Sequence, residues 1–248
     1  MKVWLFIPCL VDQFYPEVGE GMARILARLG FDLEYPSAQT CCGQPAFNSG
    51  YFDEAAEVAE HFLEVFRDAP LVVGPSGSCI SMVRIFYKQL KFKKFSPEEV
   101  AEIGSRFYEF SEFLVKKMGI VDVGARFEGR VTYHAACHLL RELGIRDEPI
   151  ELLKHVRGLE FVPMKDAEAC CGFGGTFSVK YPQLSTSMGE YKIRQALAVK
   201  ADAVVMNDVS CMMHLQGIID RQKIPLRALH IVHVLSGLLP RGTREVRA

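Results

Sequence analysis

The sequence predicts an α/β protein of two similar Rossmann-like lobes with mostly parallel sheets, produced by internal duplication. Three observations support this prediction. Short apolar segments alternate with amphipathic helical segments along most of the 248 residues, which is typical of parallel strands joined by helical crossovers. The uncommon triplet Cys-Cys-Gly occurs twice, at 41–43 and at 170–172. Each doublet also lies between two single cysteines at nearly equal spacings.

The cysteines define the repeat. Corresponding cysteines of the two halves lie 128, 129 and 132 residues apart. The two sets contain all eight cysteines of the chain: Cys9, Cys41, Cys42 and Cys79 in the first set, and Cys137, Cys170, Cys171 and Cys211 in the second. A repeat of about half the chain predicts two lobes, which we place at residues 1–120 and 121–248.

The first lobe is expected to begin with a buried strand at 3–7, where the sequence is continuously apolar. Apolar residues at helical spacing over 18–29, followed by a glycine, predict a helix. We expect strands at 31–35 and 71–73 and helices at 55–66 and 80–90. Ser96 has the sequence context of a capping box, so a helix should run from Pro97 to Lys117.

The second lobe should repeat this plan. Strands are expected at 131–135, 159–162, 203–206 and 226–229, and helices at 148–156, 184–199, from about 211 onward, and at 231–238. Each cysteine follows a predicted strand or lies in a loop beyond one. Because ligand sites of open parallel sheets form at the carboxyl ends of the strands, we expect one sulfur-lined crevice per lobe.

Composition excludes several classes of function. The formal net charge is only −1, which gives no reason to expect nucleic acid or an anionic membrane as a partner. The apolar start is too short for a signal peptide, and no run approaches the roughly 18 apolar residues of a spanning helix. We therefore expect a cytoplasmic protein without a membrane span. In a reducing compartment, eight cysteines indicate metal or redox ligands rather than structural disulfides.

Four thiolates per lobe suit zinc or an iron–sulfur cluster. Structural zinc sites usually draw on two Cys-x-x-Cys pairs, which this sequence lacks, so we expect one iron–sulfur cluster per lobe and keep zinc as the alternative. The glycine after each doublet permits an unusual turn. Helices that begin at Cys79 and Cys211 would direct their positive ends toward the thiolates. In a third interpretation, the adjacent cysteines cycle as a redox disulfide, which leaves the other four cysteines without a role.

These motifs resemble the cysteine-rich CCG domain pair that occurs in heterodisulfide reductase, in glycolate oxidase iron–sulfur subunits and in anaerobic glycerol-3-phosphate dehydrogenase. Segments 41–51, 121–125 and 170–180 are most similar to the lactate utilization protein A family. The resemblance implies a 4Fe-4S electron-transfer subunit of an L-lactate (2-hydroxy acid) oxidising complex, with a ferredoxin-like subunit and a third subunit as partners. The alternatives are a zinc-stabilised scaffold without redox turnover and a thiol/disulfide oxidoreductase.

One position departs from the wider family. Heterodisulfide reductase-like members end each motif in Cys-x-x-Cys and use five cysteines, whereas this chain has Ser76 and Asp208 at the first of these positions. The resemblance therefore implies a four-thiolate cluster, with an Asp208 oxygen as an additional ligand in the second lobe. A simpler interpretation makes both residues helix N-caps. His134, near Cys137, is expected to be an ordinary polar residue beside the crevice, with ligation as the alternative.

Overall fold

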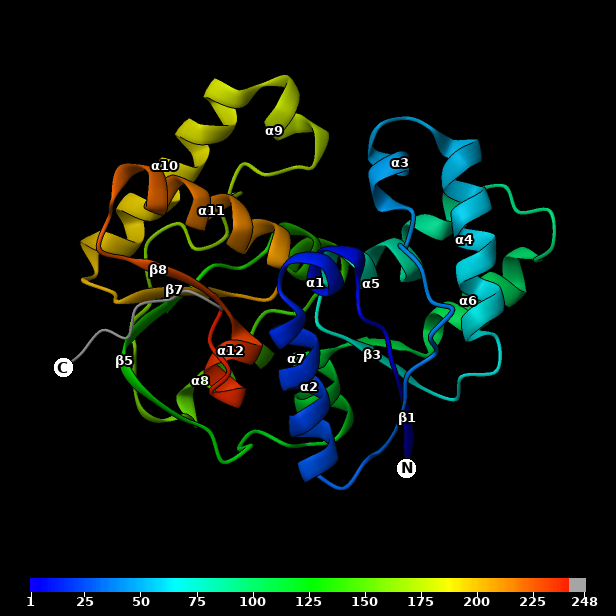
Figure 1. Cartoon of the computed structure of the whole chain (residues 1–248), viewed down its shortest axis with the longest axis horizontal. Helices are drawn as coiled ribbons and strands as arrows, with labels where there is room; N and C mark the ends of the chain where they lie inside the picture. The colour runs from blue at the N-terminus through cyan, green and yellow to red at the C-terminus, as the bar shows by residue number, and fades with distance from the viewer. Residues whose placement is uncertain (241–248) are drawn as a thin grey trace.

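The structure, a computed structural model, describes residues 1–240 (Figure 1). It contains two sheets of four parallel strands, with the orders β2-β1-β3-β4 and β6-β5-β7-β8. Matching β5–β8 to β1–β4 makes the two orders identical, so the lobes share one topology. The predicted α/β fold of two similar lobes is thereby confirmed. The boundary at 120/121 stays a prediction, and the last eight residues of the predicted second lobe, 241–248, lie outside the described residues.

The first lobe alternates strands and helices, and Figure 1 shows it on the right. Its strands are β1 (Lys2–Leu5), β2 (Asp32–Glu34), β3 (Val72–Gly74) and β4 (Phe107–Glu109). Its helices are α1 (Cys9–Phe14), α2 (Pro16–Arg28), α3 (Gln44–Asn48), α4 (Phe52–Phe66), α5 (Gly77–Arg84), α6 (Pro97–Ser105) and α7 (Phe110–Glu112), with the helical turns η1 (Phe86–Gln89) and η2 (Phe113–Lys117).

The second lobe follows the same plan. Its strands are β5 (Arg126–Tyr133), β6 (Arg157–Phe161), β7 (Ala203–Met206) and β8 (Arg227–His230). Its helices are α8 (Glu148–Lys154), α9 (Thr176–Lys180), α10 (Pro182–Ala198), α11 (Val209–Gln222) and α12 (Ile231–Ser236), with the turn η3 (His138–Glu142). Among residues 1–240, no helix combines the length and the apolar character needed to cross a bilayer.

The predicted helix from Pro97 to Lys117 is wrong. The capping box at Ser96 does start a helix, but α6 ends at Ser105 and the chain then forms the edge strand β4, which pairs with β3. Phe107 of β4 is fully buried and packs edge-to-face on Phe66, with ring centroids 5.3 Å apart. Burial of this aromatic ring against the sheet stabilises the strand more than local helix propensity stabilises a continued helix.

The two lobes share a hydrophobic core. One buried cluster contains Val3 and Phe113 from the first lobe and Val131 and Val205 from the second. Helices α2 and α12 contact each other closely at Gly21, where an added Cβ would lie 2.7 Å from side-chain atoms of α12. A larger residue there would force the two helices apart, so the small side chain permits the lobes to pack this tightly.

Polar contacts between the lobes occur in corresponding pairs. Glu109, the last residue of β4, accepts a hydrogen bond from Asn207 Nδ2 at 2.9 Å. His230, the last residue of β8, lies with its Nε2 2.8 Å from the carbonyl oxygen of Pro75. Pro75 and Asn207 each come directly after the third strand of their own lobe. Each fourth strand therefore contacts the end of the other lobe's third strand, as a twofold axis between the lobes would produce.

We expect Glu109 to make the stability of the protein depend on pH. Its side chain is fully buried, and burial raises its pKa from 4.5 to about 7. Since the folded pKa lies above the unfolded value, folding takes up a proton between these values. The stabilisation is therefore complete below about pH 4.5 and is lost as the pH rises through about 7. The contribution of Glu109 to the free energy of unfolding is on the order of 3 kcal/mol.

Urea unfolding of the reduced protein at about pH 5 and pH 8 measures this contribution. The stability of the wild type relative to Glu109→Gln should fall between the two pH values, because glutamine does not titrate. Glu102→Gln, at an exposed position of α6, is the matched control. The stability of the wild type relative to Glu102→Gln should not fall between the two pH values. Equal pH dependence of the wild type and Glu109→Gln would refute the assignment.

Candidate metal centre

All eight cysteines line one cavity of about 440 Å³ between the lobes. Residues of α3 and α9 also line it, and these helices lie on opposite sides at the top of Figure 1. We expected one crevice per lobe, and the structure instead joins the two crevices. The reason lies in the interface, because the ends of β3 and β7 meet there and both cysteine sets lie beyond the strand ends.

Three segments deliver the four sulfurs of each set. In the first lobe Cys9 begins α1 directly after β1, Cys79 lies in the first turn of α5 after β3, and the doublet lies in the loop after β2. In the second lobe Cys137 precedes η3 after β5, Cys211 lies in the first turn of α11 after β7, and the doublet follows β6. The predicted placement of the cysteines beyond the strands is confirmed.

The backbone conformation after each cysteine doublet requires a glycine. Gly43 has φ +83° and Gly172 has φ +95°, a conformation that residues with side chains rarely adopt. An added Cβ at Gly172 would also lie 2.5 Å from the carbonyl oxygen of Ser185. The amide of Gly172 donates to the Cys170 sulfur at 3.4 Å. The turn therefore positions the sulfur and also places a backbone amide in contact with it.

The thiols of each set contact one another in the same order. Cys9 and Cys41 have their Sγ atoms 3.6 Å apart, and those of Cys171 and Cys211 are 3.1 Å apart. All eight cysteines are free thiols. The two chains of neighbouring thiols are Cys9–Cys41–Cys42–Cys79 and Cys137–Cys170–Cys171–Cys211.

One thiol of each set is readily ionised. Hydrogen bonds from Cys42 and then Cys9 lower the pKa of Cys41 to about 3. In the second lobe, hydrogen bonds from the two neighbouring thiols, of which Cys137 has the larger effect, lower the pKa of Cys170 to about 2. In each set, the neighbouring thiols therefore favour the thiolate form of the first cysteine of the doublet. A metal bound by all four sulfurs would replace the thiol protons.

Comparison with known proteins identifies the same two cysteine sets. A sequence profile of the cysteine-rich CCG domain matches residues 3–84 and again 131–216, and the two matches include all eight cysteines. Lactate utilization protein A of Geobacillus thermodenitrificans is 45% identical, over 95% of this chain and 99% of its own length. The protein of the same name from Anoxybacillus flavithermus is 44% identical over the same shares. The chain belongs to the lactate utilization protein A family.

The resemblance identified in the three sequence segments is therefore confirmed. Solved structures that align with the chain are more distant. An aspartate racemase homologue from Pyrococcus horikoshii aligns over 95% of this chain and 96% of its own, with 11% identity and a TM-score of 0.33. A likeness at this level carries no argument about the site.

In this member of the family, the two cysteine sets have different surroundings. Phe6 lies three residues before Cys9, and its ring packs on Phe62 with centroids 4.9 Å apart. His134 lies three residues before Cys137 and therefore occupies the corresponding position. Its ligand nitrogen and the sulfurs of the second set's two buried cysteines all lie within 4.8 Å of one another. We expected an ordinary polar residue, and the structure brings this nitrogen to the sulfurs.

A buried lysine adds to this difference. Lys192 of α10 is fully buried, and its Nζ donates to the carbonyl oxygen of Ala167 at 3.0 Å. Burial lowers the pKa of Lys192 to about 8, and the neighbouring thiolates, Cys171 first, oppose that shift. Burial, and then the charge of Lys192, lower the pKa of His134 to about 3. The second set therefore has a neutral imidazole and a cation beside it; sequence analysis kept ligation by His134 only as an alternative and did not identify Lys192.

Ser76 and Asp208 cap the same helix. Ser76 Oγ accepts a hydrogen bond from the amide of Cys79 at 3.4 Å, as expected for an N-cap. Asp208 occupies the N-cap position of α11, as the simpler interpretation expected, but in the described part of the chain its side chain makes no hydrogen bond to that helix. Its carboxylate instead accepts from Ser76 Oγ at 2.8 Å, Ser78 Oγ at 2.7 Å and Ser78 N at 3.2 Å. It caps α5 of the other lobe, and its role as a metal ligand stays a prediction.

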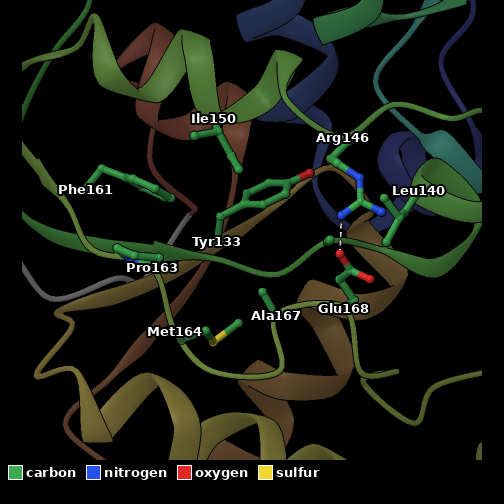
Figure 2. Close-up of a pocket in the computed structure, with 10 residues that line it drawn as sticks. Tyr133, Leu140, Arg146, Ile150, Phe161, Pro163, Met164, Ala167 and Glu168 are labelled. Atoms are coloured by element: carbon green, nitrogen blue, oxygen red, sulfur yellow. Dashed lines mark hydrogen bonds and ion pairs between the residues drawn. The ribbon is translucent and has the colours of Figure 1, made fainter.

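Figure 2 shows a smaller, mostly apolar pocket of about 120 Å³ in the second lobe. An ion pair between Arg146 and Glu168 lies at one side of it. The hydroxyl of Tyr133, which points from the pocket wall, donates to Asn207 Oδ1 at 3.0 Å. Because this hydroxyl is bonded to Asn207, whose amide in turn donates to Glu109 of the other lobe, and the ion pair satisfies the charges, we assign no chemistry to this pocket.

Asp208→Ala should destabilise the protein by about 1–3 kcal/mol, because it removes the acceptor of the donors of buried Ser76 and half-buried Ser78. Ser210→Ala is the matched control, since Ser210 occupies in α11 the position of Ser78 in α5, and its effect should be much smaller. Urea unfolding of both variants under reducing conditions measures the difference. A loss no larger than that of Ser210→Ala would disprove the contribution of the contact between the lobes.

Proposed function

We propose that the protein is the iron–sulfur electron-transfer subunit of a complex that oxidises L-lactate or a related 2-hydroxy acid. The observation that supports it best is the pair of four-thiol sets, which have the same order of contacts and line one cavity. Cysteine thiolates are the usual protein ligands of 4Fe-4S clusters. The names of the relatives supply the connection to lactate.

The residues of each set fit such a cluster. The four thiols are free and lie beside one another, so all four sulfurs can bind without disulfides being broken. Helices α5 and α11 begin at the cysteine sets, and their positive ends favour bound anions. The glycine turns add backbone donors next to the sulfurs. A cluster held in this way would supply one-electron transfer.

We further propose that the protein works in the cytoplasm with a ferredoxin-like iron–sulfur subunit and a third subunit. An electron-transfer partner has to come close to the cofactor. Apolar side chains at the cavity support such docking, since Val179 of α9 lines the cavity and is 79% exposed. Tyr181 and Leu184, a few residues further along the chain, are 58% and 55% exposed. Exposed apolar groups of this kind are typical of protein interfaces.

Purification under anaerobic conditions tests the cofactor. The protein should be brown and contain iron and acid-labile sulfide. Replacing both Cys41 and Cys42 by serine, or both Cys170 and Cys171, should remove roughly half of the iron, because each variant loses two of the thiolates that one lobe needs. Thr40→Ala, next to the first doublet, should retain the full amount of iron.

A zinc-stabilised scaffold is the second candidate. The group of His134, Cys171 and Cys211 favours it, because nitrogen and sulfur ligands together are common in zinc sites. The same purified protein distinguishes the two candidates. Zinc without acid-labile sulfide would overturn the iron–sulfur proposal, and a centre that cannot be reduced would overturn its role in electron transfer.

Growth of the source organism on L-lactate tests the substrate. Deletion of the gene should abolish growth on L-lactate but not on glucose, and the wild-type gene should restore it. A gene that encodes the double serine variant of Cys41 and Cys42 should not restore growth, because an electron-transfer subunit requires its cofactor. Normal growth of the deletion strain on L-lactate as sole carbon source would contradict the proposed substrate.

A further inference from the structure

We propose that His134 is a nitrogen ligand of the metal centre in the second lobe, so that the two centres of this protein have different donor sets. The inference rests on the proposed function and extends it to a residue outside the two cysteine sets. It follows from the position of one ring nitrogen, from the proton on the other, and from the corresponding residue in the first lobe.

The Nε2 atom of His134 is free to act as a ligand atom. The side chain is fully buried, and within residues 1–240 its Nε2 has no hydrogen-bond partner. Buried polar atoms nearly always have a partner, because leaving them unpaired is unfavourable. One ring nitrogen of His134 lies within 4.8 Å of the sulfurs of Cys171 and Cys211, and Nε2 is the ring nitrogen that is free to bind. A metal between these three atoms would satisfy the nitrogen.

The other ring nitrogen is placed as in known metal-binding histidines. Nδ1 of His134 lies 3.3 Å from the carbonyl oxygen of Ala167, which can only accept a hydrogen bond. Nδ1 therefore carries the proton, and Nε2 keeps a lone pair that can bind a metal. A backbone carbonyl that binds the second nitrogen is the usual way in which a ligating histidine is oriented. Lys192 Nζ donates to the same oxygen at 3.0 Å and helps to hold it in place.

The corresponding position of the first lobe holds a phenylalanine in place of this nitrogen. The ring of Phe6 packs among Phe62 and Phe66 of α4, with centroids 4.9 and 6.0 Å away. The two lobes otherwise share their topology and the order of their thiols. A nitrogen signal from His134 would therefore belong to the second centre alone.

Two other histidines near the second set serve as controls. His138 has its Nδ1 3.8 Å from Cys137 Sγ, and its ring packs edge-to-face on Phe86. His214 has its Nε2 3.3 Å from the carbonyl oxygen of Ser185. The Nδ1 atom of His138 thus contacts a thiol of the second set, and the Nε2 atom of His214 contacts a backbone carbonyl. They test whether mere proximity of a histidine produces the signal.

Pulsed EPR of the anaerobically purified protein in a paramagnetic state measures nitrogen bound to the cluster. We expect a strong nitrogen coupling that changes from the ¹⁴N to the ¹⁵N pattern when only histidine is labelled. The labelling distinguishes the ligand from backbone amides near the sulfurs, such as that of Gly172. His134→Phe, which installs the residue of the first lobe, should lose this coupling. His138→Phe and His214→Phe should keep it.

The outcomes separate this inference from the proposed function. Wild-type protein with iron and sulfide but no histidine coupling would overturn the inference alone, as would a coupling that survives in His134→Phe. Protein without iron and sulfide would overturn both. If His134→Phe does not fold, the labelled wild type and the two control variants decide. A histidine coupling retained in both controls supports His134, and its loss in either control assigns the signal to that residue instead.

Discussion

The contact between the ends of β3 and β7 holds the two cysteine sets in a fixed relation to each other. Asp208, at the end of β7, places its carboxylate at the first turn of α5 and accepts hydrogen bonds from Ser76 and Ser78. Helices α5 and α11 each begin beside this contact and each carry one cysteine of their set. The carboxylate is only 2% exposed, so it has to be satisfied by protein donors. The lobes cannot separate or slide here without leaving that charge unpaired.

Two further contacts make the same interface specific. Glu109 and His230 occupy corresponding positions in the two sheets and contact the residues that follow the opposite third strands. The shared apolar core stabilises the interface by burying apolar surface, which is not directional. The buried polar pairs require specific geometry and therefore permit one arrangement of the lobes. This division explains how a duplicated fold keeps its two sulfur sets in a fixed relation although each lobe has its own sheet.

The sequence predicted the parts of the structure that local patterns encode. The spacing of the cysteines predicted the repeat, and the glycines after the doublets predicted the turns, because positive φ at Gly43 and Gly172 is a local property. The strand at Phe107–Glu109 was missed because three residues are too short to show a period, and only the packing of Phe107 on another element identifies it.

The remaining features depend on contacts between distant segments. The capping of α5 by Asp208 joins residues 130 positions apart, which no local pattern encodes. One signal in the sequence could have favoured ligation by His134, namely its alignment with Phe6 three residues before the first cysteine of each set. A polar residue that replaces a core phenylalanine at an equivalent position of a repeat requires a partner, and that partner lies in the folded chain.

The single cavity also has a consequence for chemical damage. Both sets of thiols border the same continuous space of about 440 Å³. A small oxidant or chelator that enters from solvent therefore meets eight sulfurs rather than four. Oxidation of the thiols is expected to involve both lobes together rather than each lobe separately.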